Sequence, residues 1–275
     1  MFKKRQVALD PVPSQETTEE SVSISPLSAT RMSKAFPGAM SNAHFSKRLH
    51  EVLAEEGYTR ENTLLTTSFC SDEVNRDLDC NLGKYMGKNF SMGGLAGFAF
   101  GGVTSFGAMA SHIPPGGNCV IVYGPHVGID ETGQYGSVLR RGHLHSDACC
   151  GSAAAACAHV LDARAKKKTM VEFPTEPIDA QQCFVNTMLM PEGERLEKAC
   201  EPQVELGYAL FDVQDRLMKR IVAAASSKVV SPGTIALVGG IQVNTPFDQD
   251  DFFLVKTFEI RNNKGELVKG LKYSL

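Results

Sequence analysis

The stretch NCVIVYGPHVGID, residues 118–130, decides the fold class because it holds a continuous apolar run that stops at turn residues. Residues 119–123 are all apolar, and a Gly-Pro pair follows them. Such a run is typical of a strand that is buried on both faces, as in a parallel sheet covered by helices. Residues 63–69 and 234–246 are further strand candidates, and helical patterns separate them. The sequence therefore predicts an α/β protein with a mostly parallel β-sheet flanked by helices.

Three segments carry helix signals. Residues 41–56 form an amphipathic pattern that a glycine ends. Residues 71–87 begin with Ser, Asp and Glu, which suit a helix N-terminus. Residues 145–168 have Ser146 and Asp147 near the start and three lysines at the end, and both ends suit the helix dipole.

The two ends of the chain differ in character. Residues 1–30 are rich in Ser, Thr, Glu and Pro and have little apolar content, which predicts a flexible tail. Residues 31–275 carry the patterned segments and are expected to form a single domain. At the end of this domain, residues 252–260 and 266–273 flank the turn sequence RNNKG and predict a C-terminal β-hairpin.

Residues 91–113 contain no charged side chain and six glycines. The segment is long enough to span a bilayer, but its glycine content makes transfer into lipid poor, so we expect no membrane span. Gly93, Gly97 and Gly101 recur every fourth residue and would lie on one face of a helix. A face of this kind permits close helix packing, so we expect a buried or subunit-interface helix and a homodimer.

Charge and cysteine content narrow the class of protein. The net charge of −3 gives no reason to expect nucleic acid or an anionic membrane as a partner. The eight cysteines do not resemble a disulfide framework, since Cys149 and Cys150 are adjacent and no secretory signal precedes them. We therefore expect an intracellular protein with free or metal-bound thiols.

Cysteine and histidine recur where elements begin or end. Cys70 ends the first predicted strand, His126 follows the strand at residues 119–123, and Cys149 and Cys150 lie at the start of a predicted helix. The carboxyl ends of parallel strands share one edge of a sheet with the N-termini of the adjacent helices, so these side chains can converge. Two thiolates and one imidazole suit zinc, with a fourth position left for water.

Alternatives remain at this stage. Adjacent side chains diverge by about 100° on a helix, so Cys149 and Cys150 should not both bind one ion. Cys150 is the preferred ligand because Gly151 behind it allows close approach, but Cys149 stays open. The thiols could instead be core residues, or Cys70 could be a nucleophile with His126 as its base.

The motifs CSDEVNR, VYGPHVGI and CCGSAAAA, with the chain from residue 41 onward, resemble the limiting-CO2-inducible B/C family of algae and bacteria. Members of that family resemble β-class carbonic anhydrases in fold and active site, and some are termed θ-class. The β-class pattern is Cys-x-Asp-x-Arg and then His-x-x-Cys-Gly. Here Asp72 matches, Arg76 comes two positions late, and the second cysteine is displaced from position 129 to Cys150.

The resemblance implies a zinc enzyme that interconverts CO2 and bicarbonate. Zinc would be held by Cys70, His126 and Cys150, with Asp72 and Arg76 as the catalytic pair. Asp72 would orient the attacking water, and an arginine would keep Asp72 ionised and away from the metal. Arg140 or Arg141 could supply that cation instead.

The resemblance leaves a second function open, which is a catalytically silent zinc protein that acts in assembly or in bicarbonate handling. It further implies a role in a CO2-concentrating mechanism and a place in the chloroplast, in the stroma or the pyrenoid. Partners would be CO2, bicarbonate and a second copy of the chain or related subunits. No targeting peptide is visible in the sequence to support the compartment.

Overall fold

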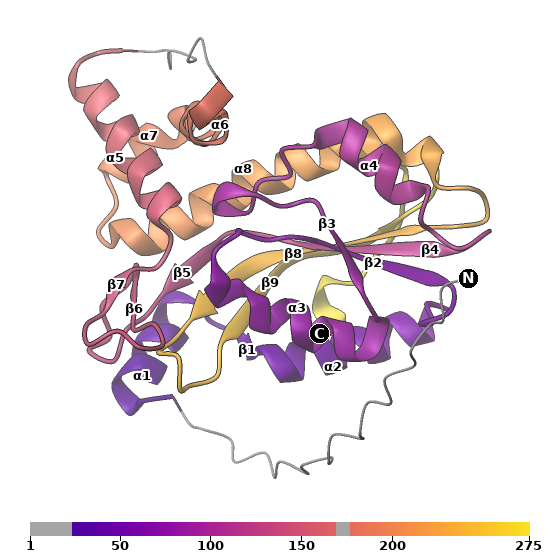
Figure 1. The fold of residues 1–275 in the computed structure, drawn as a ribbon, viewed down its shortest axis with the longest axis horizontal. Helices are drawn as coiled ribbons and strands as arrows, with labels where there is room; N and C mark the ends of the chain where they lie inside the picture. Colours follow the sequence, from indigo (N-terminus) through magenta and orange to yellow (C-terminus); the bar gives the residue numbers. More distant parts are fainter. Residues whose placement is uncertain (1–23, 169–176) are drawn as a thin grey trace, which may run out of the picture.

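The structure is a computed structural model that describes residues 24–168 and 177–275. Its centre is a mixed sheet in the order β1-β9-β8-β4-β2-β3, in which β3, β2, β4 and β8 run parallel and β9 is antiparallel to β8 (Figure 1). Short β5 extends the pairing along β8, β1 and β10 pair with β9, and β6 and β7 form a separate ribbon. The strands are β1 (Met40–Ser41), β2 (Thr63–Ser68), β3 (Asn89–Ser91), β4 (Asn118–Tyr123), β5 (His126–Gly128), β6 (Ser137–Val138), β7 (Asp147–Ala148), β8 (Ile235–Asn244), β9 (Phe252–Arg261) and β10 (Leu267–Gly270).

Helices cover both faces of the sheet, as the continuous apolar run of β4 predicts. On β4, Cys119, Ile121 and Tyr123 pack into one core cluster, while Val120 and Val122 pack into another. The α/β class with a mostly parallel sheet is confirmed. The predicted C-terminal hairpin is present as β9 and β10.

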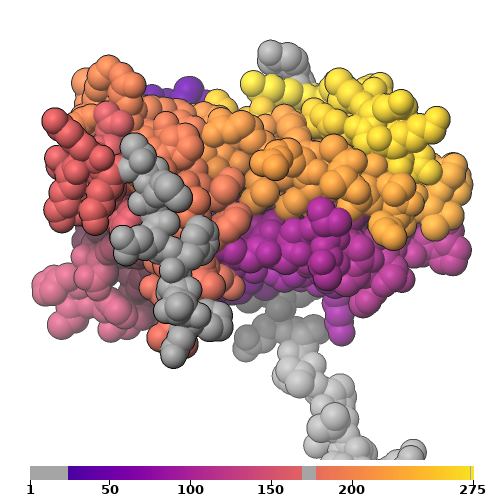
Figure 2. All heavy atoms as spheres, turned by 90° about the horizontal axis from the view of Figure 1, so that it is seen from above, coloured from indigo at the N-terminus to yellow at the C-terminus, as the bar shows by residue number. Residues whose placement is uncertain are grey.

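The helices other than α1 form three groups. Helices α4 and α8 pack on one face of the sheet and α2 and α3 on the other, while α5, α6 and α7 gather with one end of α8 beyond the sheet (Figure 1). Seen from the side of α8, the magenta atoms around α4 lie beside the orange atoms of α8 (Figure 2). The helices are α1 (Pro26–Ala35), α2 (Asn42–Glu55), α3 (Arg76–Met86), α4 (Gly102–Ala110), α5 (Gly151–Ala165), α6 (Ala180–Leu189), α7 (Gly193–Glu197) and α8 (Pro202–Ala225).

The single helix expected over residues 91–113 is wrong. The segment divides into the end of β3, a short 3-10 turn at Leu95–Gly97 and α4. Gly93 is needed for close backbone contact, because a Cβ there would lie 2.1 Å from the Phe69 carbonyl oxygen. The expected glycine face does not exist, and the homodimer inferred from it loses that support.

Two boundaries also need correction. Helix α1 begins at Pro26, with the Ser25 side chain as its N-cap, so the predicted tail does not extend to residue 30. Residues 1–23 of that tail lie outside the described residues, and the single domain over residues 31–275 stays a prediction. Helix α5 begins at Gly151, because Asp147 and Ala148 pair with β6 as β7.

Within residues 24–168 and 177–275, no helix has both the length and the apolarity needed to cross a bilayer.

Candidate metal centre

Cys70, His126 and Cys150 meet at the carboxyl-terminal edge of the parallel strands. Strands β2 and β4 pair with Ser68 opposite Tyr123, so the chain leaves both strands at one edge. Cys70 follows β2, His126 begins β5, and Cys150 is the N-cap of α5. One ligand atom from each lies within 4.8 Å of the others, and the residues are only 4%, 3% and 8% exposed.

The imidazole of His126 is oriented by Asn244 at the end of β8. Its Nδ1 lies 2.9 Å from Asn244 Oδ1. Asn244 Nδ2 donates to Asp251 Oδ2 at 2.8 Å and to the Val74 carbonyl at 3.2 Å, so the Asn244 oxygen faces the ring as an acceptor. Nδ1 therefore carries the proton, and buried Nε2 has no hydrogen-bond partner in the described chain. A free, buried Nε2 beside two sulfurs is what a metal ligand requires.

The adjacent cysteines have different places. Cys150 lies with Cys70 and His126, whereas the Cys149 sulfur lies 3.4 Å from His126 Nδ1 and 3.5 Å from Asn244 Oδ1. Cys149 therefore packs against the edge of the ring that already binds Asn244. The geometry groups Cys150, and not Cys149, with the other two potential ligands.

The close approach of the groups shifts their pKa values. A hydrogen bond from the Cys150 thiol, together with the nearby His126, lowers the pKa of Cys70. The same contact with Cys70 raises the pKa of Cys150, so the pair shares one thiol proton. For comparison, burial without such partners raises the pKa of the core thiol Cys119 to about 12. The partners in the cluster, and not burial itself, therefore stabilise a thiolate at Cys70.

Asp72 is held by Arg140. The guanidinium donates two parallel hydrogen bonds to the carboxylate, at 2.8 and 3.0 Å, and the Asp72 and Arg140 side chains are only 15% and 16% exposed. Arg140 also donates to the Cys149 carbonyl at 2.8 Å, and it forms a further ion pair with Glu73. One arginine therefore links the segment after β2 to the segment before α5.

The pairing of Asp72 with Arg76 is wrong. Arg76 is the first residue of α3, and its side chain pairs at 2.7 Å with Asp79, one helical turn along. It also donates to the Cys70 carbonyl at 2.6 Å, so it supports the backbone of a potential ligand. Arg140, which the sequence leaves open as an alternative, takes the place beside Asp72.

Asp72 stays ionised despite its burial. Burial alone would raise the pKa of its carboxyl, but the hydrogen bonds from Arg140 outweigh this and bring the pKa to about 2. One carboxylate oxygen also accepts a hydrogen bond from the Val74 backbone at 3.4 Å, as the N-cap of the 3-10 turn at Glu73–Asn75. Asp72 combines the capping role and the arginine pair, so neither excludes the other.

A comparison of the sequence with known protein families gives a match over most of the chain. Residues 39–262 match the profile of the family described as limiting CO2-inducible proteins B/C beta carbonic anhydrases. The chain belongs to this family. The resemblance seen in the sequence motifs is thereby confirmed. No curated protein matches the chain.

Solved structures of the limiting CO2-inducible group agree in fold. The chain is 46% identical to PtLCIB4, a homolog of the limiting CO2-inducible protein LCIB, with a TM-score of 0.83 over 88% of this chain and 99% of that one. A histidine-to-alanine mutant of PtLCIB4 gives 45% identity and a TM-score of 0.84, over 89% and 98% of the two chains. LCIB itself shares 22% identity and the fold, with a TM-score of 0.64 over 86% and 96%.

Two features of this family member are not evident from its motifs. Asn244 is absent from the predicted site, although its position at the end of a long apolar strand places it at the same sheet edge. Arg140 is far from Asp72 in sequence, and only the fold of the segment around β6 and β7 selects it over Arg141. A search for polar residues at the end of every predicted strand would find Asn244.

Proposed function

We propose that this protein is a zinc-dependent carbonic anhydrase that hydrates CO2 reversibly to bicarbonate. The observation that carries the proposal is the buried Cys70–His126–Cys150 cluster, in which His126 Nε2 has no other partner among the described residues. Two sulfurs and one nitrogen match the preference of zinc, and three protein ligands are typical of catalytic sites with an open fourth position. Zinc bound there would bring the pKa of a coordinated water molecule toward neutrality.

Asp72 and Arg140 would supply the remaining chemistry. The ionised Asp72 carboxylate can accept a hydrogen bond from the attacking water and orient its lone pair toward CO2. Two thiolates donate more negative charge to a metal than imidazoles do, so they would make the bound water less acidic. A fixed hydrogen-bond acceptor for the water proton would compensate for this effect. Arg140 keeps that acceptor ionised and in place through two hydrogen bonds.

The experiment that tests the proposal is stopped-flow CO2 hydration on the purified chain, with zinc content measured on the same sample. We expect one zinc per chain and loss of activity when a chelator removes it. Zinc without hydration would favour the silent protein, in which Asp72 leaves Arg140 and fills the fourth position. Activity without zinc would contradict the metal site and favour Cys70 as a nucleophile.

Replacement of Asn244 by leucine is expected to weaken zinc binding about 10- to 100-fold. Leucine has nearly the same size but cannot accept the His126 Nδ1 proton, so the tautomer with a free Nε2 is no longer favoured. Competition with a chelator of known affinity measures the change. Asn186→Leu, on α6 and outside the metal centre, is the matched control and should retain wild-type affinity.

Several further properties extend the same proposal. The names of the relatives, which refer to limiting CO2, support a role in a CO2-concentrating mechanism. A chloroplast location, in the stroma or pyrenoid, is part of the same proposal. We also propose that the chain assembles as a homodimer, or as an oligomer with related subunits. Light scattering on the purified chain tests the assembly.

A further inference from the structure

The cavity beside the potential ligands is narrow. The space next to His126 and Cys150 has a volume of about 10 Å³, against about 430 Å³ for the neighbouring pocket at the surface. CO2 has three heavy atoms in a line. A wall of this cavity that moved would therefore widen the approach of CO2 to His126 and Cys150.

Most of that wall is fixed by core packing. Val127, Leu206 and Leu210 are 5%, 3% and 1% exposed, and side chains in a close-packed interior have little room to move. Gly136 and Gln203 are the wall residues that are not buried. Since Gly136 has no side chain, Gln203 is the side chain that can move.

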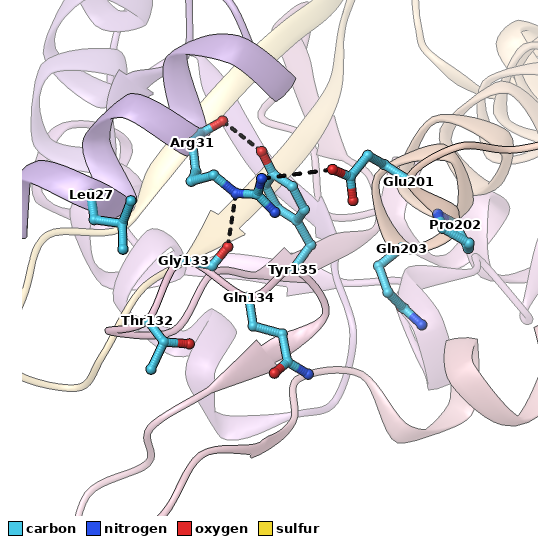
Figure 3. Close-up of a pocket in the computed structure, with 9 residues that line it drawn as sticks. All are labelled: Leu27, Arg31, Thr132, Gly133, Gln134, Tyr135, Glu201, Pro202 and Gln203. Atoms are coloured by element: carbon cyan, nitrogen blue, oxygen red, sulfur yellow. Dashed lines mark hydrogen bonds and ion pairs between the residues drawn. The ribbon is translucent and has the colours of Figure 1, made fainter.

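A larger pocket lies on the outer side of Gln203. It has a volume of about 430 Å³ and is formed by α1, the loop of residues 132–135 and the start of α8 (Figure 3). Arg31 anchors its wall, because the guanidinium lies 4.4 Å from the centre of the Tyr135 ring and Nε donates to the Gly133 carbonyl at 3.1 Å. Gln203 lines both this outer pocket and the cavity at the cluster.

Within the described part of the chain, no hydrogen bond restrains the Gln203 amide. Gly136, at φ +83°, leaves the room that Gln203 occupies, since a Cβ at that position would lie 2.7 Å from the glutamine side chain. Pro202 and Gln203 open α8, so the backbone can stay helical while the side chain changes rotamer.

We propose that the Gln203 side chain is a gate: when it rotates into the outer pocket, it opens the cavity at Cys150 to small neutral molecules. For CO2 as the admitted molecule, the inference rests on the proposed function. The pocket beside Arg140, by contrast, is lined by none of the three potential ligands. Of these two pockets, the one beside Gln203 shares a lining residue with the cavity at His126 and Cys150, and the one beside Arg140 does not.

The test measures access without using hydration. The full-length, metal-free chain is treated with iodoacetamide, and mass spectrometry follows alkylation of Cys150, with exposed Cys200 as the internal rate standard. Gln203→Ala should label Cys150 about 10-fold faster or more, the factor expected if the open rotamer is populated at about 10% or less. Gln203→Trp should slow the labelling, and Cys200 should react alike in all variants.

Gln134→Ala is the matched control, because Gln134 lines the outer pocket but not the cavity at the cluster. It should leave the Cys150 rate at the wild-type value. An unchanged rate in Gln203→Ala, or an equal increase in Gln134→Ala, would overturn the gate. A protein that hydrates no CO2 but shows the Gln203 effect would refute the proposed function and leave the gate standing.

Discussion

The Cys70→Ala variant is expected to purify without zinc and to show no CO2 hydration above the uncatalysed rate. Cys70 supplies one of two sulfur donors in the cluster, and its loss leaves a Cys–His pair, fewer than the three protein ligands typical of a catalytic zinc site. Cys149 cannot readily replace it, since its sulfur lies at the Nδ1 side of His126. Metal analysis and stopped-flow hydration on the same samples measure both losses.

Cys200→Ala is the control for this variant. Cys200 is an exposed free thiol outside the cluster, so its removal should leave zinc content and hydration unchanged. A Cys70→Ala protein that keeps a full equivalent of zinc would remove Cys70 from the ligand set. A circular dichroism spectrum like that of the wild type is needed to assign the loss of zinc to the missing sulfur.

The fold is predictable from the sequence where apolar periodicity alone determines an element. Strand β4 places alternate side chains in two cores, so its run must be continuous, and β8 has the same buried character. Residues 91–113 are not predictable in this way. Small residues serve a helix face and a close backbone contact equally well, and only the position of Phe69 against Gly93 distinguishes the two.

The candidate centre is predictable to the extent that topology brings strand ends together. Cys70, His126 and Cys150 follow from the shared edge of parallel strands. The arginine that pairs with Asp72 is not predictable in this way. Nearness in sequence favours Arg76, but on α3 the Arg76 side chain pairs with Asp79. Arg140 reaches the site through a loop whose conformation has no periodic signal.

Asp72→Asn is expected to retain zinc but to hydrate CO2 about 10- to 100-fold more slowly, the range seen when a group that positions a metal site is lost. The amide is nearly the same size as the carboxylate but carries no negative charge, so it is a weaker acceptor for the proton of the attacking water. Stopped-flow rates at saturating zinc measure the effect. Equal rates in the two proteins would assign Asp72 to helix capping alone.

Arg140→Ala extends the same prediction to the cation. Without its two hydrogen bonds, Asp72 is no longer held away from the metal position, so hydration should fall while zinc is retained or bound more tightly. Arg141→Ala is the matched control, because Arg141 is an exposed neighbour that does not contact Asp72. If released Asp72 is what blocks the site, adding Asp72→Asn to Arg140→Ala should not lower the rate further. If the loss of rate in the double variant instead equals the product of the losses in the two single variants, Arg140 acts independently of Asp72.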